Sequence, residues 1–292
     1  MAGKDDVNTQ RLPWRRWGKL ALATLMIGYL GMILFFTLFQ RELVYVPTRL
    51  TMAAAEAVAE HNGFVPWRTQ TGRLIGWKSP AASNPIGSVM IAHGNGGWSL
   101  NRAYMVPSIH AGAPLDVYIL EYPGYGPRQG SPDETTVLAA ADQAFENLPT
   151  NLPIYLVSES LGAGVVAHLA KKYSTAVAGM AMFVPFDNLA SVAQNHVPFI
   201  PAYFLLLDRY NPAKWIQSYH GPVKVIVAGS DEIVPPILGQ RLYDDYQGPK
   251  QLEIIPGAHH GETFEEPPAW WRELLEFWQA HAPIKPVVAA QK

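Results

Sequence analysis

Ser160 is the residue whose surroundings most clearly suggest covalent chemistry. The apolar run 153–157 predicts a buried strand, and the sequence SESLG at 158–162 interrupts it sharply before a helix-forming stretch. A tight strand-to-helix turn of this kind holds a serine in a strained conformation with its Oγ exposed above the sheet. The positions two before and two after the serine must be small, because the strand and helix backbones nearly touch there. Ser158 and Gly162 meet that requirement, so we interpret Ser160 as a nucleophile.

A serine hydroxyl is a weak nucleophile at neutral pH and needs a base, which an acid in turn orients. The apolar segment 223–228 predicts a strand, and Asp231 follows it at the end where parallel sheets gather their ligands. Glu232 is the weaker candidate for the acid, because the exit of the strand favours the first carboxylate. The loop after the next predicted strand carries two adjacent candidates for the base, His259 and His260.

A serine nucleophile also requires backbone N–H donors that stabilise the oxyanion of its tetrahedral intermediate. One donor is expected from the residue after the nucleophile, Leu161. The sequence HGNGG at 93–97 follows another apolar strand-like run, and its glycines allow the backbone amides to turn inward. We therefore expect the N–H of Asn95 to be the second donor. A phosphate-binding loop is the alternative for this segment, but no Lys-Ser/Thr follows and no G-x-G-x-x-G pattern is present.

With these residues identified, the chain resembles the α/β-hydrolase superfamily. It is most similar to the membrane-anchored α/β-hydrolase-domain proteins related to depalmitoylases and to serine aminopeptidase-like hydrolases. The resemblance covers roughly residues 40–282, and the matching stretches are 93–97, 121–126, 158–162, 185–186, 231–235 and 257–260. It implies a triad of Ser160, Asp231 and His260, since the base falls on the third position after Gly257. It also implies an oxyanion hole formed by Asn95 and Leu161.

The chain departs from the family pattern at three places. Ser158 replaces the usual first glycine of the turn, and Glu262 stands where an aspartate is common. Gly126 is followed by PRQG, where relatives tend to have a serine two residues further on. None of these differences removes a catalytic group, so the predicted activity stands while the rim of the site differs.

The elements that must position these residues alternate along the chain. Strand-like runs occur at 72–78, 87–92, 117–121, 153–157, 179–184, 223–228 and 251–255, and helical stretches at 134–147, 161–173 and 268–280. This alternation predicts an α/β fold, with a mostly parallel sheet covered by helices on both faces. We place one hydrolase domain at 40–282 and a C-terminal tail at 283–292. The aromatic side chains of the last helix are expected in the core.

A small lid is expected between the nucleophile and the acid. The segment 186–219 lies where the superfamily inserts its lid, and its run 197–207 is markedly apolar. The ordinary interpretation is a helix packed on the sheet. The alternative is a short hydrophobic lid that admits acyl chains and faces a bilayer.

Residues 20–39 form an uncharged apolar stretch of the length that crosses a bilayer. It is longer than the apolar region of a cleaved signal peptide, and no small-x-small cleavage site follows it, so we favour an uncleaved anchor. Five basic residues precede the stretch, and only Arg41 and Arg49 follow it closely. The positive-inside rule then predicts a cytoplasmic tail at 1–19 and an extracytoplasmic catalytic domain.

The function expected from these features is a membrane-anchored serine hydrolase that cleaves carboxylic ester or thioester bonds. A serine peptidase or amidase of the same fold and a catalytically silent hydrolase-fold binding protein are the alternatives. The expected partners are a small-molecule or lipid acyl ester and, through residues 20–39, the lipid bilayer. No cofactor or metal is expected, since cysteine is absent and no H-E-x-x-H motif occurs. A net charge of −2 and the lack of a basic run beyond the N-terminus argue against nucleic acid.

Overall fold

The computed structural model describes residues 14–282. The predicted tail 283–292 and residues 1–13 of the predicted cytoplasmic tail lie outside this range. The contacts within the chain divide it into two compact units, Met1–Gln40 and Arg41–Lys292.

The first unit contains most of one long helix, α1 (Trp14–Val44). Its apolar side chains are mostly exposed, and Arg16–Val44 is long and apolar enough to cross a membrane. The predicted anchor 20–39 lies inside this helix. The last residues of α1, from Arg41 onward, belong to the second unit.

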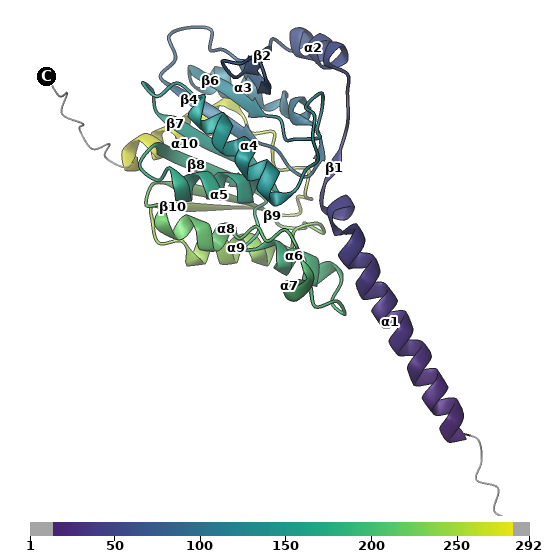
Figure 1. Ribbon diagram of the computed structural model, residues 1–292. Helices are drawn as coiled ribbons and strands as arrows, with labels where there is room; N and C mark the ends of the chain where they lie inside the picture. Colours follow the sequence, from purple (N-terminus) through teal and green to yellow (C-terminus); the bar gives the residue numbers. More distant parts are fainter. Residues whose placement is uncertain (1–13, 283–292) are drawn as a thin grey trace, which may run out of the picture. The chain divides into compact units, whose positions relative to one another are not determined.

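The second unit is built on an eight-stranded sheet with the order β10-β9-β8-β7-β4-β6-β3-β2 (Figure 1). Its strands are β2 (Val65–Arg68), β3 (Leu74–Ser79), β4 (Gly87–Ala92), β6 (Leu115–Leu120), β7 (Ile154–Glu159), β8 (Val177–Phe183), β9 (Val223–Ala228) and β10 (Lys250–Ile255). All neighbours from β10 to β6 pair in parallel, whereas β3 and β2 add antiparallel at one edge. A separate two-stranded sheet joins β1 (Val46–Pro47) to β5 (Gly96–Gly97).

Helices cover both faces of this sheet. They are α2 (Met52–His61), α3 (Met105–Gly112), α4 (Glu134–Glu146), α5 (Gly162–Lys172), α6 (Leu189–His196), α7 (Ala202–Leu205), α8 (Pro212–Trp215), α9 (Pro236–Asp245) and α10 (Pro268–His281), with 3-10 turns at Ser99–Arg102 and Ile216–Ser218. Helices α4 and α5 pack over one face, while α3 and α10 pack together on the other. Each face therefore has its own hydrophobic core.

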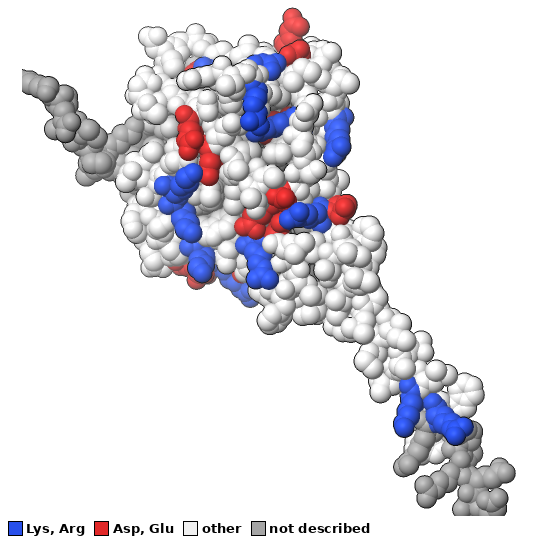
Figure 2. Space-filling model, in the orientation of Figure 1, with Lys and Arg blue, Asp and Glu red and all other residues white. Residues whose placement is uncertain are grey.

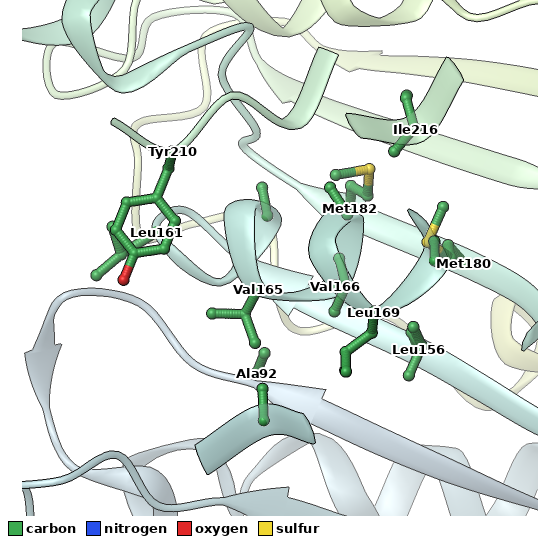
Figure 3. Close-up of a cluster of buried hydrophobic side chains, with 14 of the residues drawn as sticks. Ala92, Leu156, Leu161, Val165, Val166, Leu169, Met180, Met182, Tyr210 and Ile216 are labelled. Carbon is green, nitrogen blue, oxygen red and sulfur yellow. The ribbon is translucent and has the colours of Figure 1, made fainter. Parts of the chain in front are cut away.

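The core beneath α5 holds the nucleophile turn in place. Val165, Val166 and Leu169 of this helix belong to one buried cluster with Leu156 of β7 and Met180 of β8, and Leu169 lies beside Leu156 (Figure 3). All five side chains are fully buried. Burial of apolar side chains of this size contributes about 1.5–3 kcal/mol each, so the start of α5 is firmly fixed against the end of β7.

The predicted α/β fold is confirmed, and the predicted strands are present with bounds shifted by up to two residues. The sequence analysis did not predict β1, β2 or β5. Strands β1 and β5 have two residues each, and the four-residue β2 contains a proline, so none of them gives a clear strand pattern. In α10, Trp270, Trp271 and Trp278 are buried as expected, whereas Phe277 is only partly buried. The predicted lid segment contains α6, α7, α8 and the second 3-10 turn.

Candidate active site

Ser160 lies immediately after the carboxyl end of β7, in the middle of the sheet. Its backbone φ is +50°, a conformation that only one other non-glycine residue adopts among residues 14–282. The strained turn is fixed by a hydrogen bond of 3.0 Å from the N–H of Ser160 to the carbonyl of Phe183. A second bond of 2.9 Å runs from the N–H of Ala163 to the Ser160 carbonyl. The sequence therefore adopts a sharp strand-to-helix turn of the kind that presents a nucleophile.

The two small residues that flank the turn are under different steric limits. A Cβ atom on Gly162 would lie only 2.1 Å from the carbonyl oxygen of Ala92, so glycine is required there. Ser158 is buried, and its hydroxyl has no hydrogen-bond partner within the described residues. The first position thus accommodates a side chain of serine size, which explains how the chain departs from the family pattern without losing the turn.

Asp231 and His260 come together as the sequence predicts. The distance from His260 Nδ1 to Asp231 Oδ2 is 2.7 Å. The other carboxylate oxygen of Asp231 accepts hydrogen bonds from the N–H groups of Ile233 and Val234, each 2.8 Å long. Asp231 is buried, whereas the His260 side chain keeps 18% of its surface exposed. With Nδ1 held by Asp231, Nε2 is the ring nitrogen of His260 that can take part in proton transfer.

The two alternative candidates, Glu232 and His259, pair with each other instead. His259 Nδ1 lies 2.8 Å from Glu232 Oε1, and the two side chains are 55% and 68% exposed. The hydrogen bond with Glu232 raises the pKa of His259, and the same bond lowers the pKa of Glu232. The exposed pair stands on the surface beside the buried one.

Ser160 and His260 are not joined by a hydrogen bond in the part of the chain that the structure describes. Catalytic hydrogen bonds are often long or poorly aligned before substrate binds and shorten in the complex. Ser160 and Asp231 lie at the carboxyl ends of β7 and β9, two strands apart, where parallel sheets gather their ligands.

The two expected oxyanion donors, Asn95 and Leu161, have available N–H groups. Neither backbone N–H donates a hydrogen bond to another residue in the range 14–282. The rest of Asn95 is held firmly, because its side chain donates to the carbonyl of Val44 at 3.0 Å. Its own carbonyl accepts from the Tyr125 hydroxyl at 2.7 Å and from the N–H of Val46 at 3.0 Å. A fixed loop with an unused N–H is the form that an oxyanion hole takes.

An ion pair that the sequence analysis missed connects this loop to the nucleophile turn. The guanidinium of Arg102 binds both carboxylate oxygens of Glu159, the residue directly before Ser160. Arg102 Nη1 also donates to the carbonyl of Gly96 at 3.2 Å. Burial disfavours the charged form of Arg102, but the hydrogen-bonded Glu159 outweighs it and the pKa of Arg102 is raised. The one signal in the sequence was a carboxylate inside a turn otherwise made of small residues.

The same ion pair restricts the oxyanion loop sterically. A Cβ atom on Gly94 would lie 2.7 Å from Glu159 Oε1 and 3.3 Å from Arg102 Nη2. A larger residue at position 94 would therefore have to displace the Arg102–Glu159 ion pair.

A second buried polar group lies behind the loop. Glu121 accepts from the N–H and the hydroxyl of Ser99, at 3.1 and 2.7 Å. Burial raises the pKa of Glu121 to about 7. Burial also lowers the pKa of His93 well below its ordinary value, and His93 Nε2 lies 3.9 Å from Glu121. The base of the loop therefore carries a neutral imidazole at neutral pH.

Comparison with known proteins identifies the family. The model of the alpha/beta hydrolase family matches residues 89–219. The uncharacterized protein Rv2307c of Mycobacterium tuberculosis is 36% identical over 80% of this chain and 84% of its own length. The chain belongs to the α/β-hydrolase superfamily.

More distant members of the superfamily have named activities. The lysophosphatidylserine lipase ABHD12 of Danio rerio is 25% identical over 61% of this chain and 52% of its own length. Among solved structures, Est1E from Butyrivibrio proteoclasticus with bound ferulic acid matches with a TM-score of 0.56 at 14% identity, covering 70% of this chain and 94% of that one. The Pyrococcus furiosus esterase Pf2001 gives 0.55 at 14% identity, covering 81% and 99%. The chain is thus a hydrolase of the α/β fold with esterase- and lipase-like neighbours.

Proposed function

We propose that this protein is a membrane-anchored serine hydrolase that cleaves carboxylic ester or thioester bonds through an acyl-enzyme intermediate. The observation that carries the proposal is the buried Asp231, which accepts hydrogen bonds from two backbone N–H groups and lies 2.7 Å from His260, at the carboxyl ends of the parallel strands where Ser160 also lies. The ABHD12 relative is named for the hydrolysis of a lipid ester, which supports an acyl ester as substrate.

In the first half of the reaction, Ser160 Oγ attacks the acyl carbonyl carbon and its proton passes to Nε2 of His260. Asp231 stabilises the imidazolium that forms. The N–H groups of Asn95 and Leu161 bind the oxyanion. The carbon–oxygen or carbon–sulfur bond to the leaving group then breaks, and His260 returns its proton to that alcohol or thiol. In the second half, water attacks the acyl-enzyme by the same route and releases a carboxylic acid.

The nucleophile is tested with a fluorophosphonate probe. We expect Ser160→Ala to abolish labelling while the fold is retained, as checked by circular dichroism. Ser158→Ala is the matched control, because it removes a buried neighbouring hydroxyl and should label as the parent does. Undiminished labelling of Ser160→Ala would contradict the proposal. No labelling of the parent protein would instead favour the catalytically silent binding protein.

The anchor is a separate part of the proposal. We propose that residues 20–39 span the membrane with the N-terminus in the cytoplasm, because the basic residues concentrate before the span. An uncleaved anchor should keep the full-length protein with the membranes after an alkaline wash. Release by the wash, or loss of the N-terminal residues from the mature chain, would contradict an uncleaved anchor.

A further inference from the structure

Four large apolar or aromatic side chains are exposed together around α7. Phe199, Tyr203, Phe204 and Leu207, here called the α7 patch, expose 79%, 51%, 82% and 60% of their surface. The surface over α6 and α7 carries few charges on the face shown in Figure 2. Contiguous exposed apolar surface of this kind marks a site of interaction with a partner or a membrane.

The segment that carries the α7 patch is packed against the rest of the domain. Between its members, Ile200, Ala202 and Leu206 turn inward and are buried. The Tyr203 hydroxyl lies 2.9 Å from Ser191 Oγ of α6. The exposed side chains of the α7 patch therefore belong to a segment whose other side chains are buried.

The position of the patch along the chain points to a bilayer as its partner. Leu207 is followed by the buried Asp208, whose carboxylate accepts from Arg41 Nη2 at 3.2 Å and from the Tyr45 hydroxyl at 2.9 Å. Arg41 is two residues beyond the end of the proposed span at Phe39, or about 3 Å along a helix. Asp208, next to the patch, is thus hydrogen-bonded to residues that closely follow the apolar stretch 20–39.

A cationic side chain at the edge of the patch suits a phospholipid surface. Arg209 donates from Nε to the carbonyl of Leu206 at 2.9 Å and from Nη2 to that of Phe204 at 3.3 Å. These bonds keep a guanidinium beside the apolar side chains. In a protein bound at a membrane surface, cationic side chains bind lipid phosphates and neighbouring apolar side chains enter the acyl region. Arg209 and the α7 patch have this arrangement.

The segment that carries the patch is also connected to the catalytic acid. His196, at the end of α6, lies 2.8 Å through Nε2 from the carbonyl of Ile233. The N–H of Ile233 in turn donates to Asp231. Ile233 itself is 51% exposed, so the acid loop also carries an exposed apolar side chain.

We propose that the α7 patch inserts into the bilayer leaflet next to the anchor and passes lipid acyl esters from it to Ser160. This inference rests on the proposed hydrolase activity and on the anchor, and it names the bilayer as the source of the substrate.

The absence of cysteine from the chain gives a direct test on the full-length protein. We would introduce Phe204→Cys, attach an environment-sensitive fluorophore, and reconstitute the protein in phosphatidylcholine–phosphatidylglycerol vesicles with or without lipids that carry a quencher high in the acyl chain. Asn151→Cys is the control, because Asn151 is exposed before the amino end of β7, opposite to Ser160. We expect several-fold stronger quenching at position 204. Equal quenching at both positions, or burial of position 204 against a second copy of the chain shown by cross-linking, would overturn the proposal.

A second measurement tests the passage of substrate. In the double variant Phe199→Ser/Phe204→Ser, we expect turnover of a long-chain monoacylglycerol in vesicles to fall about tenfold, with turnover of a soluble acetyl ester unchanged. An equal loss on both substrates, or no loss on either, would overturn the role of the patch. Two further measurements test the proposals on which this inference depends. Absence of fluorophosphonate labelling would refute the hydrolase, and failure of the protein to float with vesicles would refute the anchor.

Discussion

Two carboxylate–histidine pairs stand side by side in this protein and differ in almost everything except distance. The Asp231–His260 and Glu232–His259 contacts measure 2.7 and 2.8 Å. Asp231 is buried and bound by two backbone amides, whereas both side chains of the second pair are more than half exposed. A short ion pair therefore does not mark a catalytic residue. Burial and attachment to the backbone distinguish the pair that can orient a base.

The largest expected effect separates the two histidines. His260→Ala removes the proposed base and should lower kcat for a soluble aryl ester roughly 10⁴- to 10⁶-fold. His259→Ala removes only an exposed ion pair and should change it less than about fivefold. Steady-state kinetics of the two variants measure the contrast. Similar losses from both would show that the geometry of the pair does not decide its role.

The two acids should differ nearly as much. Asp231→Asn keeps the size of the side chain but loses the charge that stabilises the imidazolium, so kcat should fall about 10⁴-fold. The matched Glu232→Gln should leave kcat within about fivefold, because its carboxylate is solvated. Steady-state kinetics of both variants with the soluble aryl ester measure this difference. A large loss in Glu232→Gln alone would assign the acid to the second carboxylate.

A third ion pair, Arg102–Glu159, extends the comparison from catalysis to stability. Arg102→Met leaves the buried Glu159 carboxylate without its partner and should lower the free energy of unfolding by about 3–5 kcal/mol. The double variant Arg102→Met/Glu159→Met removes both charges and should recover most of that loss. Urea unfolding monitored by tryptophan fluorescence measures both changes. An unaltered midpoint in Arg102→Met would show that this pair contributes no more than an exposed one.

The smallest effect concerns the titration of the exposed pair. The pKa of His259 is raised by Glu232, so Glu232→Gln should lower it toward the ordinary value of about 6.5. A raised histidine pKa stabilises the fold below the unfolded-state pKa, and this contribution disappears as the pH rises through the folded-state pKa. Because both side chains are exposed, we expect no measurable change in melting temperature. Proton NMR of the imidazole resonances follows the titration, and an unchanged His259 pKa in the variant would contradict the assigned cause.

The sequence was sufficient to predict those features that depend on local pattern. Apolar runs at regular intervals predicted the parallel strands, because a strand buried on both faces needs a continuous apolar segment. The small residues around Ser160 predicted the turn, and steric limits such as that at Gly162 explain why. The edge strand β2 was missed because short antiparallel edge segments carry little pattern of their own.

Tertiary structure alone decided how the polar groups are distributed. The position after the strand favoured Asp231 over Glu232, and the family resemblance favoured His260 over His259, but the sequence does not show which carboxylate is buried. The fold buries one acid under two amides and leaves its neighbour in solvent. Only the fold joins Arg102 to Glu159 across 57 positions of sequence. Partners of polar groups are set by long-range chain packing, because a buried charge needs whichever partner the fold brings within hydrogen-bond distance.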